Sequence, residues 1–184
     1  MQLSDATIRR MRSMGMITLR CSLDSKELKQ ALGAVSMDDI PETGKFCTEG
    51  NTLAAWMSPD ELLLMVPDEA VEHMVETIDA SLNPMPRLVA DVSDARVMFE
   101  VQSAGIRDIL AKETPADMSE SAIGPQDFRR TRLGQVAVAI WFPAPDAARL
   151  VCRTSEAEYV RELLAASCAS ESPGFHDTRS EQGR

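Results

Sequence analysis

The segment spanning residues 45–67, KFCTEGNTLAAWMSPDELLLMVP, places two strand-like runs on either side of a tight turn. The first run ends at Trp56 and Met57, and the second is LLLMV. Pro59 and Asp60 suit the central positions of a type I turn, because proline already holds the φ angle that the first of these positions needs. Two runs joined this closely predict a β-hairpin, so the chain is expected to contain an antiparallel sheet.

Amphipathic helices alternate with the strand-like runs. Ser25 precedes the helical stretch KELKQALG, which Gly33 closes, and a second helix is expected from Pro67 to about Leu82. A third helix follows LVADVSD and ARVMFEVQ, which predict two strands separated by a turn. A fourth, EAEYVRELLAAS, follows the strand ARLVCR behind an S-x-x-E capping box. The predicted fold class is therefore α+β, with mostly antiparallel sheets and packed amphipathic helices.

Two strand-then-helix units resemble each other in the order of their parts. LLLMVPDEAVEHMVETI and ARLVCRTSEAEYVRELL each contain a strand, a capped turn with Glu-Ala and an amphipathic helix. The similarity favours a repeat, in which one unit occurs twice about a pseudo-twofold axis.

Length and composition set the domain organisation. A chain of 184 residues with 44% hydrophobic side chains can build one sizeable core, or two small lobes. We expect a flexible N-terminal arm over residues 1–15, a single compact α+β domain over residues 16–168 with two lobes as the alternative, and a disordered tail over residues 169–184.

The charge balance excludes two classes of partner. The net charge is −10, with 29 acidic and 19 basic side chains, and such a field repels nucleic acid and anionic membranes. No apolar run of signal length follows the first arginines, and no stretch approaches the roughly 20 apolar residues that cross a bilayer. The four cysteines form no C-x-x-C pair, which favours reduced thiols. We expect a soluble, cytoplasmic protein.

Few side chains combine into a catalytic or cofactor site. His73 falls roughly 140° from the apolar stripe of its helix and is expected to face solvent. Cys47 and Cys152 lack a partner base, and the glycine-rich dinucleotide and phosphate motifs are absent. Asp91 and Asp94 can present carboxylates outward from their turn, although self-capping of the turn explains them as well. We predict no catalytic, cofactor-binding or metal-binding residue in this chain.

A partner interface is the function that the remaining side chains suit best. Arg129, Arg130 and Arg132 form a basic cluster in an acidic chain, which fits an acidic partner surface, with a solvated strand face as the alternative. Trp56 in the hairpin and Trp141 in the strand VAVAIWF are aromatic residues of the kind that anchor specific interfaces. We hypothesise that these five residues contribute to a partner interface and that an exposed apolar patch lies near the Trp56 hairpin or the Trp141 strand.

Four segments resemble, in the same order, the gamma subunit of heterotetrameric bacterial sarcosine oxidase. They are WMSPDELLLMVP, VADVSDARVMFEVQSAGIRDILAK with PADM after it, TRLGQVAVAIWF, and RLVCRTSEAEYVRELL. The hairpin reads SPDEL where the family usually has SPDEW, and the third helix opens with QSAG where G-x-G or G-P is more usual. The family looks like a reduced relative of the folate-binding aminomethyltransferase fold, in which the stretch around residues 91–110 is a core strand pair and helix.

The resemblance implies a non-catalytic structural and assembly subunit. The family's complex is expected to demethylate sarcosine oxidatively to glycine, with production of hydrogen peroxide and one-carbon transfer to tetrahydrofolate. The resemblance implies the alpha, beta and delta subunits as partners, alpha most directly. It also implies that FAD, FMN, NAD, tetrahydrofolate and zinc are bound in those other subunits and that this chain holds no cofactor.

A stand-alone folate-binding protein of the same fold is the alternative, such as a one-carbon transferase or an iron–sulfur maturation factor. That factor carries a K-G-C-x-x-G-Q-E motif, and the nearest string here is KFCTEGNT. Phe46 replaces the glycine and the Gln-Glu pair is missing, so we treat the similarity as accidental. A generic interaction module unrelated to sarcosine is a third class.

Overall fold

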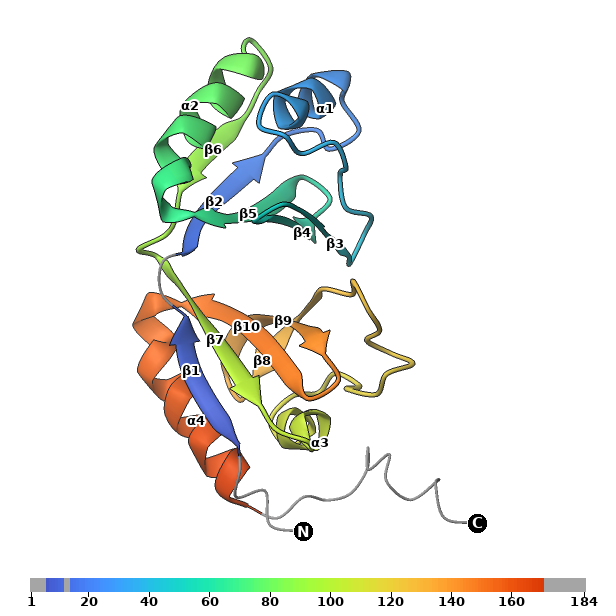
Figure 1. Ribbon diagram of the computed structural model, residues 1–184, viewed down its shortest axis with the longest axis vertical. Coiled ribbons are helices and arrows are strands. Elements are labelled where there is room, and N and C mark those ends of the chain that lie inside the picture. The colour runs from blue at the N-terminus through green and yellow to red at the C-terminus, as the bar shows by residue number, and fades with distance from the viewer. Residues whose placement is uncertain (1–5, 12–13, 171–184) are drawn as a thin grey trace. The chain divides into compact units, whose positions relative to one another are not determined.

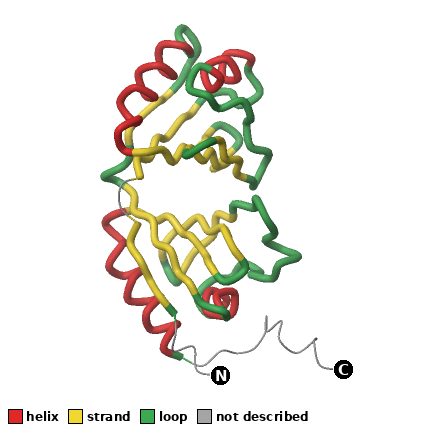
Figure 2. Tube along the Cα trace, viewed as in Figure 1, coloured by secondary structure: helices red, strands yellow, loops and turns green. Residues whose placement is uncertain are grey.

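The computed structural model describes residues 6–11 and 14–170, which form two compact units (Figure 1). Unit 1 holds the residues up to Met11 and those from Val97 onward, and unit 2 holds the residues from Arg12 to Arg96. Each unit contains a five-stranded sheet with helices on one face, as the yellow strands and red helices of Figure 2 show. The predicted α+β class with antiparallel sheets is confirmed for the described residues.

In unit 2 the strand order is β3-β4-β5-β2-β6, and the paired strands are antiparallel. Helices α1 and α2 cover one face and share its core with the sheet through Leu28, Leu32, Leu64 and Ile78. The elements of unit 2 are β2 (Met14–Arg20), α1 (Lys26–Gly33), β3 (Phe46–Glu49), β4 (Thr52–Ser58), β5 (Glu61–Pro67), the 3₁₀ turn η1 (Asp68–Ala70), α2 (Val71–Ser81) and β6 (Leu88–Asp91).

Local sequence signals place the hairpin and the first helix of unit 2 as predicted. β4 and β5 pair around Pro59 and Asp60, and the Ser58 hydroxyl donates to the Asp60 carboxylate at 2.6 Å. Ser25 is the N-cap of α1, where its hydroxyl oxygen accepts from the Leu28 backbone N–H at 3.2 Å. The cap satisfies one of the backbone donors that the first turn of a helix leaves unpaired.

In unit 1 the strand order is β1-β7-β10-β9-β8. Helices α3 and α4 cover one face, and their core includes Phe99, Ile109, Leu150 and Leu164. The elements of unit 1 are β1 (Thr7–Met11), β7 (Arg96–Gln102), α3 (Ile106–Ala111), β8 (Arg129–Leu133), β9 (Val136–Ala144), β10 (Ala147–Arg153), the 3₁₀ turn η2 (Thr154–Glu156) and α4 (Ala157–Ala169).

The expected N-terminal arm is in part a strand. Residues 7–11 form strand β1, which pairs with β7 from Thr7 opposite Gln102 to Met11 opposite Met98, where the sequence analysis expected a flexible arm. The apolar residue Ile8 packs against the unit 1 core, so the strand gains burial as well as backbone pairing. Residues 1–5, 12–13 and 171–184, which include most of the expected tail, lie outside the described residues, while Ala169 still belongs to α4.

The two strands predicted around residue 91 are present, but the prediction that they pair with each other is wrong. β6 pairs with β2 in unit 2, whereas β7 pairs with β1 in unit 1. The turn between them explains the separation. The Ser93 hydroxyl donates to the Asp91 carboxylate at 2.5 Å and accepts from the Met16 backbone N–H at 3.0 Å. Ser93 therefore holds this turn beside β2 in unit 2. After the turn the chain forms β7, which belongs to the sheet of unit 1.

The predicted S-x-x-E capping box is also wrong. Residues 154–156 form the 3₁₀ turn η2, and α4 begins after Glu156 with no hydrogen bond from a capping side chain. The 3₁₀ turn takes the place of the cap, because its tighter hydrogen bonds continue directly into the first turn of the α-helix.

The two units have the same order of elements. Unit 2 runs β2-α1-β3-β4-β5-η1-α2, and unit 1 runs β7-α3-β8-β9-β10-η2-α4. Each sheet is extended by an edge strand that precedes the first strand of the other unit in the chain. β1 precedes β2 but pairs with β7, and β6 precedes β7 but pairs with β2.

Candidate functional site

The predicted basic cluster lies on β8, an edge strand of unit 1 (Figure 1). Arg129, Arg130 and Arg132 are all exposed. Side chains alternate along a strand, so Arg130 and Arg132 share one face of the sheet and Arg129 lies on the other. There the Arg129 guanidinium donates to the Ala122 carbonyl at 2.9 Å. The cluster therefore presents two arginines, not three, on a single face.

The two tryptophans lie in different environments. Trp56 is half-buried at a register irregularity of β4, next to the hairpin turn. Trp141 on β9 is only 1% exposed, and its ring lies 5.4 Å from that of Phe128. The expected exposed patch at Trp141 is therefore wrong, because the indole is core. The alternation of large and small residues in VAVAIWF does not reveal that both faces of this strand are buried.

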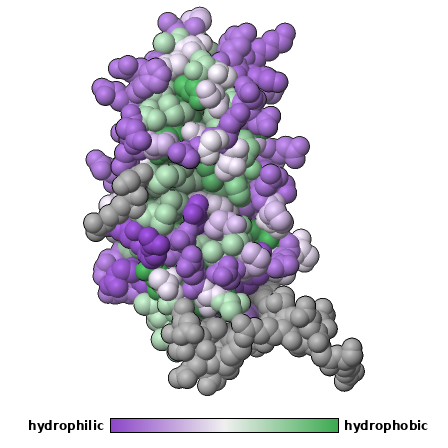
Figure 3. Space-filling model, viewed as in Figure 1, coloured by the Kyte–Doolittle hydropathy of each residue, from purple (hydrophilic) through white to green (hydrophobic). Residues whose placement is uncertain are grey.

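Exposed apolar side chains are few in the described part of the chain. The face drawn in Figure 3 is mainly hydrophilic, with smaller groups of apolar side chains between the charged ones. The large hydrophobic residues that are exposed are Leu88, at 49%, and Tyr159, at 44%. A candidate site on the described surface is therefore distinguished by a cavity and by charge rather than by a broad apolar patch.

The titratable candidates lie apart from one another. His73 is exposed on α2, as predicted. Burial raises the pKa of the Cys152 thiol to about 11 and raises that of Cys47, to which Asp39 and Glu49 also contribute. A raised pKa keeps sulfur in the thiol form, which is the poorer nucleophile and metal ligand. Within residues 6–11 and 14–170, no three His, Cys, Asp or Glu side chains converge on a point that could hold a metal ion.

A buried arginine that the sequence analysis missed organises the long loop of unit 1. Arg107 on α3 is 9% exposed, and its two terminal nitrogens donate to the carbonyls of Met118 at 2.6 Å and Ile123 at 3.1 Å. Its guanidinium carbon lies 3.8 Å from the centre of the Phe142 ring. Burial lowers the pKa of Arg107, against the opposing effect of Glu120. The sequence signal is weak, because an arginine in a short amphipathic helix usually faces solvent.

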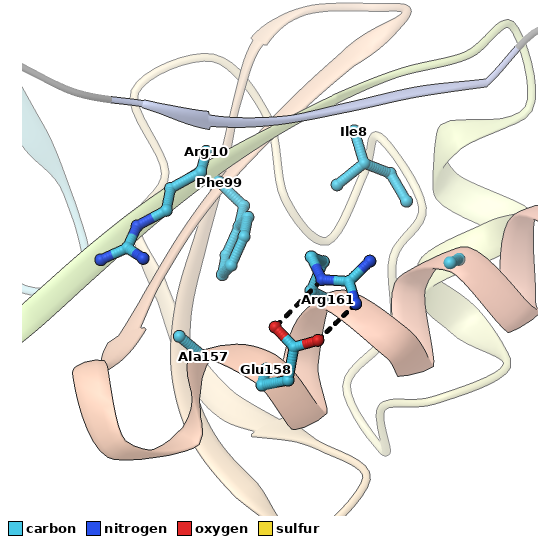
Figure 4. A pocket seen from close by; sticks show the side chains of 7 residues that line it. Ile8, Arg10, Phe99, Ala157, Glu158 and Arg161 are labelled. Atoms are coloured by element: carbon cyan, nitrogen blue, oxygen red, sulfur yellow. Dashed lines mark hydrogen bonds and ion pairs between the residues drawn. The ribbon is translucent and has the colours of Figure 1, made fainter.

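A cavity of about 160 Å³ lies between β1 and α4 in unit 1 (Figure 4). Its apolar floor comes from one residue on each of β1 and β7 and from two alanines of α4, and its rim carries three charged side chains. The lining residues are Ile8, Phe99, Ala157 and Ala165 on the floor, with Arg10, Glu158 and Arg161 on the rim. The sequence analysis missed this site because it treated residues 1–15 as an arm.

The rim of this cavity carries charged side chains of both signs. The Arg161 guanidinium donates to both carboxylate oxygens of Glu158, one of them at 3.1 Å, as the dashed lines of Figure 4 mark. This hydrogen bonding lowers the pKa of Glu158 and raises that of Arg161, so both stay ionised. Figure 4 shows the Arg10 guanidinium pointing away from this pair. The cavity therefore combines an apolar floor with a charged rim, on which Arg161 is paired with carboxylates and Arg10 points away from them.

The chain matches the model of one protein family over most of its length. The model of the family described as "Sarcosine oxidase, gamma subunit family" matches residues 25–170. The chain belongs to the sarcosine oxidase gamma subunit family. The resemblance drawn from the four sequence segments is thus confirmed. Among the described helices of this family member, none is both long and apolar enough to cross a membrane.

Curated members of the family match over part of their length. The sarcosine oxidase subunit gamma of Corynebacterium sp. (strain U-96) is 26% identical over 113 residues, which are 61% of this chain and 54% of that protein. The corresponding subunit from Arthrobacter sp is 29% identical over 114 residues, or 62% of this chain and 54% of that protein. The match spans about half the length of these gamma-subunit relatives.

Solved structures show the fold of the family. A chain of the heterotetrameric sarcosine oxidase from Corynebacterium sp. U-96, in complex with pyrrole 2-carboxylate, matches with a TM-score of 0.80 and 24% identity, covering 90% of this chain and 87% of that one. The glycine cleavage system aminomethyltransferase T from Bartonella henselae matches with a TM-score of 0.64 and 13% identity, covering 90% of this chain and 47% of that one. The fold of this chain is thus similar to about half of that aminomethyltransferase chain.

Proposed function

We propose that this chain is a non-catalytic structural subunit of a heterotetrameric sarcosine oxidase. The observation that carries the proposal is the family match over residues 25–170. The side-chain chemistry agrees with a structural role. His73 is exposed on a helix, the thiols have raised pKa values, and the buried Arg107 holds two loop carbonyls. These groups stabilise the fold or contact solvent, and none lies beside another in the arrangement that a nucleophile and its base require.

The proposed complex supplies the chemistry through its other chains. It demethylates sarcosine oxidatively to glycine, releases hydrogen peroxide and transfers the one-carbon unit to tetrahydrofolate. The alpha, beta and delta subunits are the proposed partners, with alpha in most direct contact. FAD, FMN, NAD, tetrahydrofolate and zinc belong to those chains. This chain contributes surface and stability to the assembly.

Co-expression with the other oxidase chains of the same organism tests the proposal. We expect a stable complex to be recovered on affinity purification, with a yield of sarcosine-dependent peroxide activity that falls when this chain is omitted. The observation that speaks for the alternative, a stand-alone folate-binding protein, is the likeness in fold to an aminomethyltransferase. A chain that purifies alone and binds tetrahydrofolate in a calorimetric titration would replace the proposal by that alternative.

Trp56 and the arginines of β8 remain the residues that we propose for the partner interface. Trp141 is no longer among them, because its side chain is buried. Trp56→Ala is expected to weaken assembly by about tenfold, because half-buried tryptophans often anchor interfaces. Leu88→Ala is the control, since Leu88 is an exposed apolar residue on β6, three strands away from the strand of Trp56 in the unit 2 sheet. Affinity is measured by surface plasmon resonance on the partner chains. Equal affinity for both variants and the wild type would remove Trp56 from the interface.

We also propose that the two units are copies of one ancestral unit that exchange their first strands. The support is the shared order of elements and the reciprocal placement of β1 and β6. In such an exchange, the first strand of each copy pairs with the sheet of the other copy. It accounts for the separation of β6 and β7, which no local sequence signal predicts.

A further inference from the structure

Strand β1 is an open edge of the unit 1 sheet. It pairs with β7 over Thr7–Met11, and the structure places no strand on its other side among the residues that it describes. In an antiparallel pair, alternate residues direct their backbone N–H and C=O groups away from the partner strand. With respect to the described residues, the outer side of β1 therefore has backbone donors and acceptors without a partner strand, and an extended segment beside it can pair with them.

The cavity between β1 and α4 lies directly beneath this edge. Ile8 and Arg10 are two residues apart, so both project from the same face of β1 and line the cavity with Phe99 from β7. Figure 4 shows β1 above the cavity and α4 below it, with the lining side chains between them. A strand added to the edge would direct every second side chain toward the same face as Ile8 and Arg10, and hence toward this cavity.

Charge selects the chemistry of the added strand. The segment of residues 12–96 carries 15 acidic and 7 basic side chains, whereas the rest of the chain carries 14 and 12, so unit 1 is the less acidic part. At the cavity itself, Arg161 is paired with Glu158 and Glu162, whereas Arg10 is the cationic lining side chain that points away from these carboxylates. A carboxylate beside an apolar side chain fits this rim and floor.

A second copy of this chain fits the edge poorly. Two β1 strands paired edge to edge would bring the arginines of the sequence TIRRM close to those of the other copy, and neighbouring like charges on paired strands are destabilising. The arginines thus act against self-pairing, as charges on edge strands commonly do. The same charges favour an acidic partner.

We propose that an extended, acidic segment of a partner chain adds a strand to the open edge of β1, inserting an apolar side chain into the cavity between β1 and α4 and placing a carboxylate against Arg10. Backbone pairing supplies affinity, and the cavity supplies specificity, as in other complexes formed by strand addition. The proposal rests on the proposed function, because the partner is taken to be another chain of the oxidase.

A cavity-filling substitution tests the proposal with a matched control. Ala165 lines the cavity, whereas its neighbour Ala166 does not, and both are exposed on α4. In the co-purified complex, Ala165→Trp is expected to weaken binding at least about tenfold by blocking insertion, and Ala166→Trp to leave affinity unchanged. Equal affinity for Ala165→Trp and the wild type would overturn the proposal. If the wild-type chain itself fails to assemble, it is the proposed function that fails.

A charge reversal and amide exchange supply independent readouts. Arg10→Glu is expected to weaken assembly about tenfold at low salt and less at high salt, with the melting temperature of the isolated chain unchanged. Hydrogen–deuterium exchange of Thr7–Met11 is expected to slow in the wild-type complex relative to the isolated chain. Unchanged exchange in β1 would overturn the proposal. An Arg10→Glu chain that self-associates, yet still binds its partners at wild-type affinity, would show that the arginines only prevent self-pairing of the edge.

Discussion

Arg107→Ala is expected to lower the free energy of unfolding of unit 1 by about 3 kcal/mol. The substitution removes both donors from the carbonyls of Met118 and Ile123 and opens space beside Phe142. Buried carbonyls without a donor pay their full desolvation cost, and the loop of residues 113–128 loses its attachment to α3. A loss of this size is large, because a whole domain is stabilised by only about 5–15 kcal/mol.

Urea denaturation followed by tryptophan fluorescence measures this effect at a reporter in unit 1. The chain has two tryptophans, one in each unit, so Trp56→Phe leaves Trp141 as the reporter of unit 1. Arg107→Lys is expected to fall between the wild type and Arg107→Ala, since an ammonium group can still donate to one carbonyl. Arg153→Ala is the control, because the Arg153 side chain is 73% exposed, and it should change stability by less than about 0.5 kcal/mol. A midpoint for Arg107→Ala equal to that of the control would mean that the loop does not depend on this clamp.

Local signals account for the parts of the fold that the sequence predicts well. The hairpin around Pro59 and Asp60 and the start of α1 at Ser25 depend on residues within a few positions of each other. Their backbone preferences and side-chain hydrogen bonds act before any tertiary contact forms. The apolar stripe of α2 is equally local, and Val71, Met74 and Ile78 are buried as the helical spacing predicts.

Long-range pairing accounts for the parts that the sequence does not predict. β1 is a short strand rich in arginine, and its partner β7 lies almost ninety positions further along the chain. β6 and β7 are separated by one turn, yet Ser93 ties that turn to Met16. No pattern within either segment indicates which sheet it joins, because period-two alternation specifies a face and not a neighbour.

The candidate site follows the same division. The solvent exposure of His73 follows from the helical stripe, and the exposure of the β8 arginines follows from their charge. The burial of Trp141 and of Arg107 cannot be predicted in this way, since it depends on segments that are distant in sequence. The cavity at Arg10 exists only because β1 joins a sheet that α4 covers. Sites built between an edge strand and a distant helix therefore need the structure to be recognised.

Gly15→Ala is expected to lower the free energy of unfolding of unit 2 by about 2–3 kcal/mol. Gly15 lies on β2, and a Cβ atom there would overlap Cγ2 of Val71 and approach Cγ2 of Val66 at 3.4 Å. Val71 is the first residue of α2, and its branched side chain has few rotamers in which to move away. The added methyl group therefore forces α2 away from the sheet, and the core between them loses packing.

A double-mutant cycle distinguishes this clash from a general intolerance of change in β2. Val71→Ala alone removes buried methyl groups and should also destabilise unit 2, but Gly15→Ala in that background no longer overlaps Cγ2 of residue 71 and keeps only the ordinary contact with Val66. The combined variant is therefore expected to be more stable than the sum of the two single effects by at least about 1 kcal/mol, in urea denaturation followed by circular dichroism. Gly33→Ala is the control, because a Cβ there lies 3.9 Å from the Asp38 carboxylate, and helical alanine is favoured over glycine. Strict additivity would show that the close approach of β2 and α2 at Gly15 does not limit packing, because the strain would then arise elsewhere in the strand.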